Sequence, residues 1–72
     1  MANGQAQMRL KENFNVQTSR LCVIAINNRE ELCWEYYGEY DGLKYAVYIS
    51  AVDGEEKTCF RIISTDTGDM VI

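Results

Sequence analysis

The stretch YAVYISAVDGEEKTCFRII, residues 45–63, decides the fold of this chain. Large apolar side chains alternate with small or polar ones on both sides of Asp53-Gly54, which is the pattern of two half-buried strands joined by a turn. Asp-Gly pairs tolerate the positive φ values that tight hairpins require. A two-residue loop at this point pairs Val47 with Phe60 and predicts an antiparallel hairpin.

The same period of two extends toward the N-terminus. Strands are predicted near 17–26, 31–39, 44–52 and 57–63, with room for a short terminal strand at 70–72. The turns between them are Asn27-Asn28-Arg29, Asp41-Gly42 and Asp53-Gly54, and short turns between successive strands favour an antiparallel meander. The first loop can hold two or four residues, and either length leaves the same side chains on each face.

The N-terminal segment has a different period. Ala6, Leu10 and Phe14 recur every four residues, which places them on one face of a helix from about residue 3 to 14. Seventy-two residues is the length of one small domain. We therefore predict a single domain, 1–72, of the α+β class, with one N-terminal helix packed on a four-stranded antiparallel meander sheet.

The predicted registers divide the strand residues between two faces. The helix face, which the helix is expected to cover, carries Leu21, Val23, Ala25, Leu32, Trp34, Tyr36, Tyr45, Val47, Ile49, Ala51, Phe60 and Ile62. The far face carries Cys22, Ile24, Ile26, Cys33, Glu35, Tyr37, Ala46, Tyr48, Ser50, Cys59, Arg61 and Ile63.

The far face is more apolar than expected for a sheet surface in water. A second copy of the domain, a neighbouring domain of a longer chain, or a protein partner would each cover it. Tyrosines on this face combine apolar area with a hydroxyl, a property that enriches them in interfaces. The candidate interface residues are Ile24, Ile26, Tyr37, Ala46, Tyr48, Arg61 and Ile63.

Charge and hydropathy exclude two kinds of partner. The net charge is −4 and the seven Lys and Arg residues are dispersed, so no basic stripe is present for nucleic acid. No apolar run is long enough to span a bilayer, and the N-terminus lacks the pattern of a signal peptide. No membrane contact by this fragment is expected, and any anchor would lie outside it.

The composition also argues against catalysis, cofactors and metals. The chain has no His, which removes the commonest general base, and its three cysteines lack CxxC spacing. Glu35 with the carboxylates at the turns could form a paired-carboxylate site, but acidic residues at hairpin ends are more often solvated turn formers. Asp53-Gly54-Glu55-Glu56 does not match a calcium loop. We expect no catalytic, cofactor-binding or metal-binding residue.

The thiols leave one question open. A two-residue loop at Asn27-Asn28 places Cys22 directly opposite Cys33, where a cross-strand disulfide can form under strain. Buried free thiols acting as small hydrophobic groups are the favoured alternative.

With its strands placed, the chain resembles a PepSY-type domain, and more narrowly the PepSY repeats of a spore-germination protein. The resemblance covers about residues 13–72 and is carried by Arg20-Leu21, Leu32-Cys33-Trp34-Glu35-Tyr36, Tyr45 to Ala51, Asp53-Gly54-Glu55-Glu56 and Thr65 to Gly68. It implies a helix on an antiparallel sheet without enzymatic activity.

The same resemblance implies a function. It suggests a protein-interaction or regulatory module of a germination protein that associates with a cortex-lytic hydrolase or neighbouring domains, spore-associated and extracytoplasmic. The alternative is an inhibitory PepSY domain that restrains a peptidase, as in peptidase propeptides. A homodimer is compatible with both.

Overall fold

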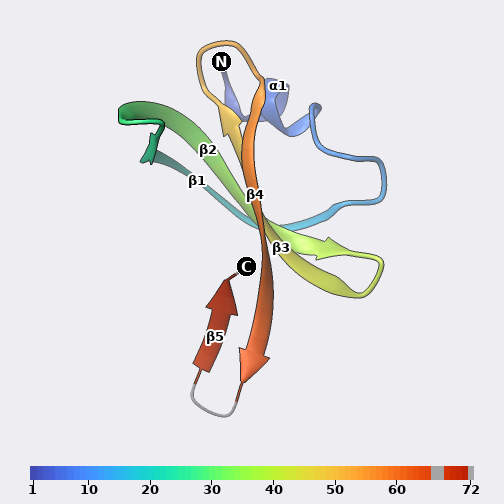
Figure 1. The fold of residues 1–72 in the computed structure, drawn as a ribbon. Coiled ribbons are helices and arrows are strands. Elements are labelled where there is room, and N and C mark those ends of the chain that lie inside the picture. The colour runs from blue at the N-terminus through green and yellow to red at the C-terminus, as the bar shows by residue number, and fades with distance from the viewer. Residues whose placement is uncertain (66–67, 72) are drawn as a thin grey trace.

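The fold is a sheet of five strands with a short helix at its N-terminal end (Figure 1). The computed structural model describes residues 1–65 and 68–71. The elements are α1 (Asn3–Gln7), β1 (Asn15–Ile26), β2 (Arg29–Tyr40), β3 (Leu43–Ser50), β4 (Glu56–Thr65) and β5 (Gly68–Val71). The strands are antiparallel and follow one another in chain order, which confirms the meander. The terminal strand begins at Gly68, two residues before the predicted start, and residue 72 lies outside the described residues.

The first hairpin has the two-residue loop of the two alternatives, and the second hairpin has its predicted register. Asn27 and Asn28 have φ values of 52° and 63°, and Asp41 and Gly42 have values of 53° and 78°. Positive φ at both central residues matches the right-handed twist of the strands, so each pair closes a two-residue loop. The resulting pairs include Cys22 with Cys33, Trp34 with Ile49 and Tyr36 with Val47.

The third hairpin differs from the prediction by one residue. Val47 pairs with Cys59, not with Phe60, and the register shifts once more between Tyr48 and Ile49. The cause is the connection, because five residues, 51–55, separate β3 from β4 instead of two.

The side chains of Ser50 and Asp53 explain this longer loop. The Ser50 hydroxyl accepts the amide of Val52 at 3.1 Å, and Asp53 Oδ1 accepts the amide of Glu55 at 2.8 Å. A one-residue slip moves every side chain of a strand to the other face. Phe60 and Ile62 therefore lie on the far face, whereas Cys59, Arg61 and Ile63 lie on the helix face, the reverse of the prediction.

The predicted helix from 3 to 14 is also wrong in length, since α1 ends at Gln7. Gly4 weakens the first turn, and Asn13 takes a left-handed conformation with φ 70° that a helix cannot accommodate. Short isolated helices are marginal in water, so packing decides the backbone here. Leu10 and Phe14 still pack against the core, but from an irregular segment.

The core lies between α1 and the middle of the sheet. Its buried members are Ala6, Tyr36, Val47 and Ile49. Polar contacts hold the N-terminal segment in place, because the Tyr36 hydroxyl lies 2.8 Å from Asn3 Oδ1 and the indole N–H of Trp34 donates to the Met1 carbonyl at 2.9 Å.

This cover stops before the outer strand. Asn3 Nδ2 reaches Ser19 Oγ at 3.1 Å, and beyond that point the helix-face side chains of β1 are exposed. Leu21 is 49% exposed and Val23 is 59% exposed, although both were predicted to be covered by the helix. No helix among the described residues is long and apolar enough to cross a membrane.

Candidate functional site

A row of three polar side chains crosses the far face from β1 to β3. Arg20 pairs with Glu35 across β1 and β2, and Glu35 pairs with Tyr48 across β2 and β3. The guanidinium Nε of Arg20 lies 2.6 Å from Glu35 Oε1, and the Tyr48 hydroxyl donates to Glu35 Oε2 at 2.5 Å. Both carboxylate oxygens therefore have donors, which makes the burial of Glu35 tolerable.

The row also sets the charge state of its members. Burial alone raises the pKa of Glu35, but the hydrogen bonds from Arg20 and Tyr48 outweigh it and hold that pKa below its ordinary value. Burial, followed by the bond to Glu35, raises the pKa of Tyr48 far above its ordinary value. Glu35 is thus a carboxylate and Tyr48 a neutral phenol at neutral pH. A carboxylate held in this way is a poor general acid, so the geometry fits a structural role.

Beside this row the far face is hollowed into an apolar groove of about 360 Å³. The rings of Tyr48 and Phe60 meet edge to face, with centroids 6.1 Å apart and an angle of 79° between the ring planes. The far-face groove is lined by Ile24, Ala25, Ile26, Tyr48, Lys57, Thr58 and Phe60. The rings of Tyr48 and Phe60 belong to the apolar floor of this groove, and Lys57 is the one charged residue among the described residues that line it.

The structure brings together three of the seven predicted interface residues in this groove, namely Ile24, Ile26 and Tyr48. Tyr37 is 38% exposed and belongs to the same face. Ala46 lies on this face too but is only 3% exposed, so it offers almost no surface to a partner.

The other two predicted residues, Arg61 and Ile63, lie on the opposite side of the sheet because of the shifted register of β4. Phe60 takes their place on the far face and is 37% exposed. Sequence reasoning missed it, and the one signal that could have found it is the pair of turn-capping side chains, Ser50 and Asp53, ahead of β4.

An ion pair at one end of the groove joins β2 and β4. Lys57 Nζ lies 3.6 Å from Glu31 Oε2, although β3 separates the two strands, and 3.3 Å from Glu55 Oε2. Glu31 Oε2 is buried and accepts no hydrogen bond within the described part of the chain, so the nearby ammonium is its main compensation.

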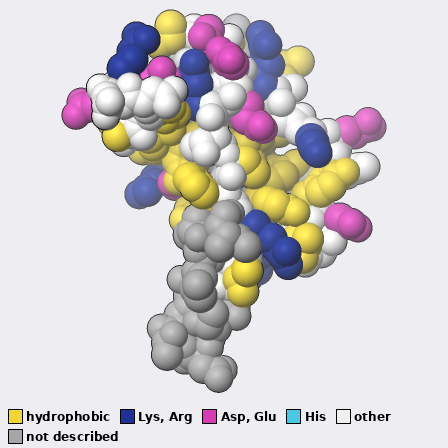
Figure 2. Space-filling view, viewed as in Figure 1, with side chains coloured by type: hydrophobic (Ala, Val, Ile, Leu, Met, Phe, Trp, Pro, Cys, Tyr) yellow, Lys and Arg dark blue, Asp and Glu magenta, His cyan; other side chains and the backbone are white. Residues whose placement is uncertain are grey.

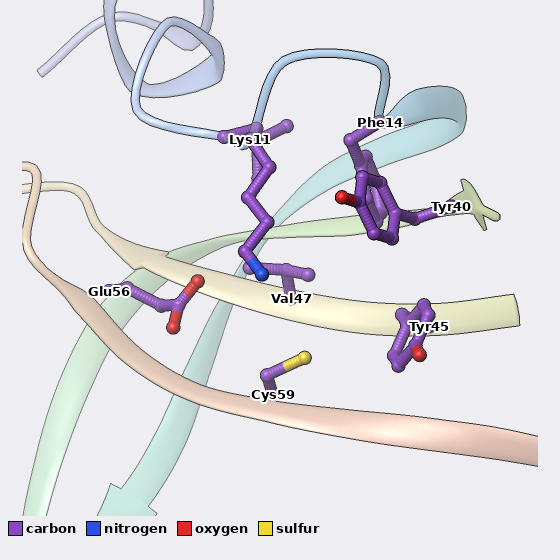
Figure 3. Close-up of a pocket in the computed structure, with 8 residues that line it drawn as sticks. Lys11, Phe14, Tyr40, Tyr45, Val47, Glu56 and Cys59 are labelled. Carbon is purple, nitrogen blue, oxygen red and sulfur yellow. The ribbon is translucent and has the colours of Figure 1, made fainter. Parts of the chain in front are cut away.

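The helix face carries a second, smaller hollow of about 210 Å³ between the N-terminal segment and β4 (Figure 3). Figure 3 shows Lys11 reaching down toward Val47, with Glu56 and Cys59 on the β4 side. The ammonium of Lys11 lies 5.4 Å from the centre of the Tyr40 ring, a cation–π distance. The hollow is lined by Leu10, Lys11, Phe14, Tyr40, Tyr45, Val47, Glu56 and Cys59. Leu10, Lys11 and Phe14 reach it from the irregular segment after α1, which was predicted as helix, so the sequence did not reveal the hollow.

On the face of the molecule seen in Figure 2, apolar and charged side chains lie in different areas. Figure 2 shows apolar side chains gathered in the middle of the face in view, with Lys, Arg, Asp and Glu side chains around its margin. An apolar centre with a charged rim is the usual arrangement of a protein-binding surface.

The cysteines lie in three different environments. All three are free thiols, with Cys33 buried, Cys22 half-buried and Cys59 exposed. Cys22 and Cys33 share the far face as predicted, but Cys59 lies on the helix face. Burial raises the pKa of each thiol, so none is activated as a nucleophile. Within residues 1–65 and 68–71, no group of three or more His, Cys, Asp or Glu side chains could hold a metal ion.

Comparison with solved structures gives one informative likeness. The chain is similar to the Bacillus megaterium YpeB C-terminal domain, with a TM-score of 0.82 and 31% sequence identity. The match covers 85% of this chain and 27% of that chain, so this chain spans about a quarter of that structure's length. No family model matches the chain, and no curated protein matches it either.

Proposed function

We propose that this chain, which has the fold of a YpeB-like, PepSY-type domain, is a non-catalytic protein-interaction module of a germination protein similar to YpeB. The observation that carries the proposal is the likeness to the YpeB C-terminal domain in both backbone and sequence. It confirms the resemblance to a PepSY-type domain that the strand motifs indicated. The matched segment is part of a longer chain there, which supports a module that works beside other domains.

The far-face groove is the surface that we assign to a cortex-lytic hydrolase or a neighbouring domain. Its apolar floor includes Ile24 and the exposed ring of Phe60, and aromatic anchors in pockets dominate the binding energy of many interfaces. Lys57 in the lining is already paired with Glu31 and Glu55, so the groove offers apolar rather than charged contacts. An apolar segment of the partner would complement it.

The row of Arg20, Glu35 and Tyr48 beside the groove supports this assignment because its bonds hold the groove wall in place. Tyr48 is held by Glu35, and Glu35 is held by Arg20, so the groove wall is ordered before any partner arrives. A preorganised surface loses less conformational entropy on binding.

The test is a binding experiment with the full chain and a purified spore cortex-lytic hydrolase. Ile24→Lys places a charge on the groove floor without touching the Glu35 row, whereas Phe60→Lys also removes the ring contact with Tyr48. Each should weaken binding at least about tenfold. Tyr48 is unsuitable for this purpose, because its hydroxyl also satisfies Glu35.

Val52→Lys is the matched control. Val52 is 82% exposed in the loop between β3 and β4 and lies outside the groove, so the same substitution there should leave affinity unchanged. Circular dichroism should show the same fold for all three variants. Unchanged binding by Phe60→Lys would remove the groove from the interface.

Inhibition assays on a panel of peptidases, run in parallel, distinguish the alternative function, which is that of an inhibitory PepSY domain. Inhibition of a peptidase by the chain, together with failure to bind the hydrolase, would replace the germination role by that of a peptidase-restraining domain.

A further inference from the structure

The outer strand of the sheet, β1, has a neighbour on one side alone. It is twelve residues long and pairs with β2, and no strand among residues 1–65 and 68–71 lies along its other edge. Figure 1 shows the tip of the β1–β2 hairpin standing clear of α1. A long open edge presents a row of backbone N–H and C=O groups that are ready to pair with another strand.

A backbone hydrogen bond on the edge of β2 away from β1 shows which way these backbone groups point. The Leu32 carbonyl accepts the amide of Ala51 at 2.9 Å, so Leu32 turns this group away from β1. Val23 lies opposite Leu32, so these two residues form a pair that shares no hydrogen bond. The N–H and C=O of Val23 therefore point away from β2, toward the open edge. Alternation along the strand gives Leu21 and Ala25 the same outward direction.

The residues with outward backbone groups also have exposed apolar side chains. Leu21 and Val23 are 49% and 59% exposed, and Leu32 beside them is 43% exposed. The N-terminal segment reaches Ser19 and does not cover these side chains. The backbone and the apolar surface of β1 are thus open at the same place.

The one irregularity in the pairing of β1 lies between Val16 and Thr18, and from residue 18 onward the strand lacks the features that usually protect an edge. It contains neither Pro nor Lys, and its one charged residue, Arg20, is engaged by Glu35. In addition, no carboxylate occurs between Glu12 and Glu30, in a chain whose net charge is −4. Two copies that repel each other elsewhere can approach along this strand.

We propose that β1 pairs antiparallel with β1 of a second copy, with the two-fold axis at Cys22. This register places Leu21 of each copy opposite Val23 of the other and pairs residues 18–26 of both strands. Each of the two most exposed apolar side chains on the strand then gains an apolar neighbour, and no two like charges face each other.

The pattern favours a second copy because the edge is complementary to itself. The pair of Leu21 with Val23 occurs twice, once on each side of the axis, which is the requirement for an isologous two-fold interface. The assembly closes as a dimer, since both copies use their β1 edge. The dimer uses the backbone edge of β1 and the side chains of Leu21 and Val23, and neither side chain lines the far-face groove.

The test measures the mass of the full chain in reducing buffer by sedimentation equilibrium over a range of concentrations. The parent chain should dimerise, and Val23→Lys should raise the dissociation constant at least about tenfold. Val52→Lys adds the same charge at an exposed apolar residue away from the edge and should dimerise like the parent.

Val23→Pro tests the backbone itself. Its amide points outward, so proline removes a donor to the second copy without removing one to β2, and edge strands tolerate proline at such a position. The variant should be folded by circular dichroism and monomeric. Added salt should strengthen the dimer of the parent chain, because it screens the repulsion between two acidic copies.

Three results would overturn the proposal. They are a parent chain that stays monomeric up to its solubility limit, a folded Val23→Pro variant that dimerises like the parent, and loss of the dimer in Val52→Lys as much as in Val23→Lys. A monomeric parent whose Val23→Pro variant loses hydrolase binding would assign the edge to a strand of the hydrolase instead.

Discussion

Glu35 is bound by Arg20 across the first strand pair, with Nε to Oε1 at 2.6 Å, yet the two side chains differ sharply in exposure: 4% for Glu35 and 69% for Arg20. The acid is buried and the base faces water. The pair therefore secures a buried carboxylate by means of a cation that loses little hydration. Tyr48 completes the arrangement from the third strand.

Glu35→Gln should destabilise the fold by about 1–3 kcal/mol, because the amide cannot accept charge-assisted bonds from both Arg20 and Tyr48. Urea unfolding of the variant and the parent gives this difference. Glu55→Gln is the control, since Glu55 is exposed and pairs with Lys57 at the surface, where such pairs contribute little. Equal midpoints for the Glu35 variant and the parent would show that the row has no structural role.

The stability should fall in acid. The pKa of Glu35 in the folded chain lies below its ordinary value of 4.5, so its contribution is present above that value and is lost as the pH falls through the folded pKa. The lowered pKa of Asp53, caused first by the backbone amide of Glu55, acts in the same direction. Unfolding free energies measured from pH 7 downward should show the loss. The Glu35→Gln variant should show a shallower decline, and an equally steep one would exclude Glu35 as its source.

Gly38→Ala and Gly4→Ala should have opposite effects. A Cβ at Gly38 would overlap the Asn15 carbonyl oxygen and lie 2.6 Å from Cε1 of Phe14, so the change should cost about 1–3 kcal/mol. A Cβ at Gly4 meets nothing within 4 Å, and alanine there should stabilise α1 by up to about 1 kcal/mol. Thermal melts of both variants decide the matter. A Gly38→Ala variant as stable as the parent would mean that the strand start at Asn15 can move aside.

Alkylation by iodoacetamide should modify Cys59 first, Cys22 more slowly and Cys33 after unfolding, following their exposure. Mass spectrometry at successive times gives the order. The intact mass without reductant should match three free thiols. A mass lower by two hydrogen atoms, located to Cys22 and Cys33 by peptide mapping, would show a disulfide between them.

The sequence predicted the second hairpin, and allowed the two-residue loop of the first, because of the residues at their turns. Asn27-Asn28 and Asp41-Gly42 consist of residues that adopt positive φ, and a two-residue loop leaves no freedom of register. Asp53-Gly54 has the same composition but lies within a five-residue loop, where the Asp53 side chain binds the Glu55 amide. Local side-chain bonding of this kind is invisible to a pattern of period two.

The site was predicted in part for the same reason. Ile24, Ile26 and Tyr48 follow from the hairpins that were placed correctly, and they meet in the far-face groove. Arg61 and Ile63 were assigned through the third hairpin and inherited its error. The helix prediction was wrong for another reason. The spacing of Leu10 and Phe14 correctly indicated that both pack against the core, but they do so from an irregular segment and not from a helix.

The connection of residues 51–55 has a consequence for comparing such domains. A relative with one residue fewer between the same two strands would present Cys59 and Arg61 where this chain presents Phe60, although the strand sequences were identical. A sequence alignment that ignores the length of this loop would then match residues that lie on opposite faces of the sheet. Loop length here selects which of two chemically different surfaces the fourth strand offers, so specificity can change between domains by insertion alone.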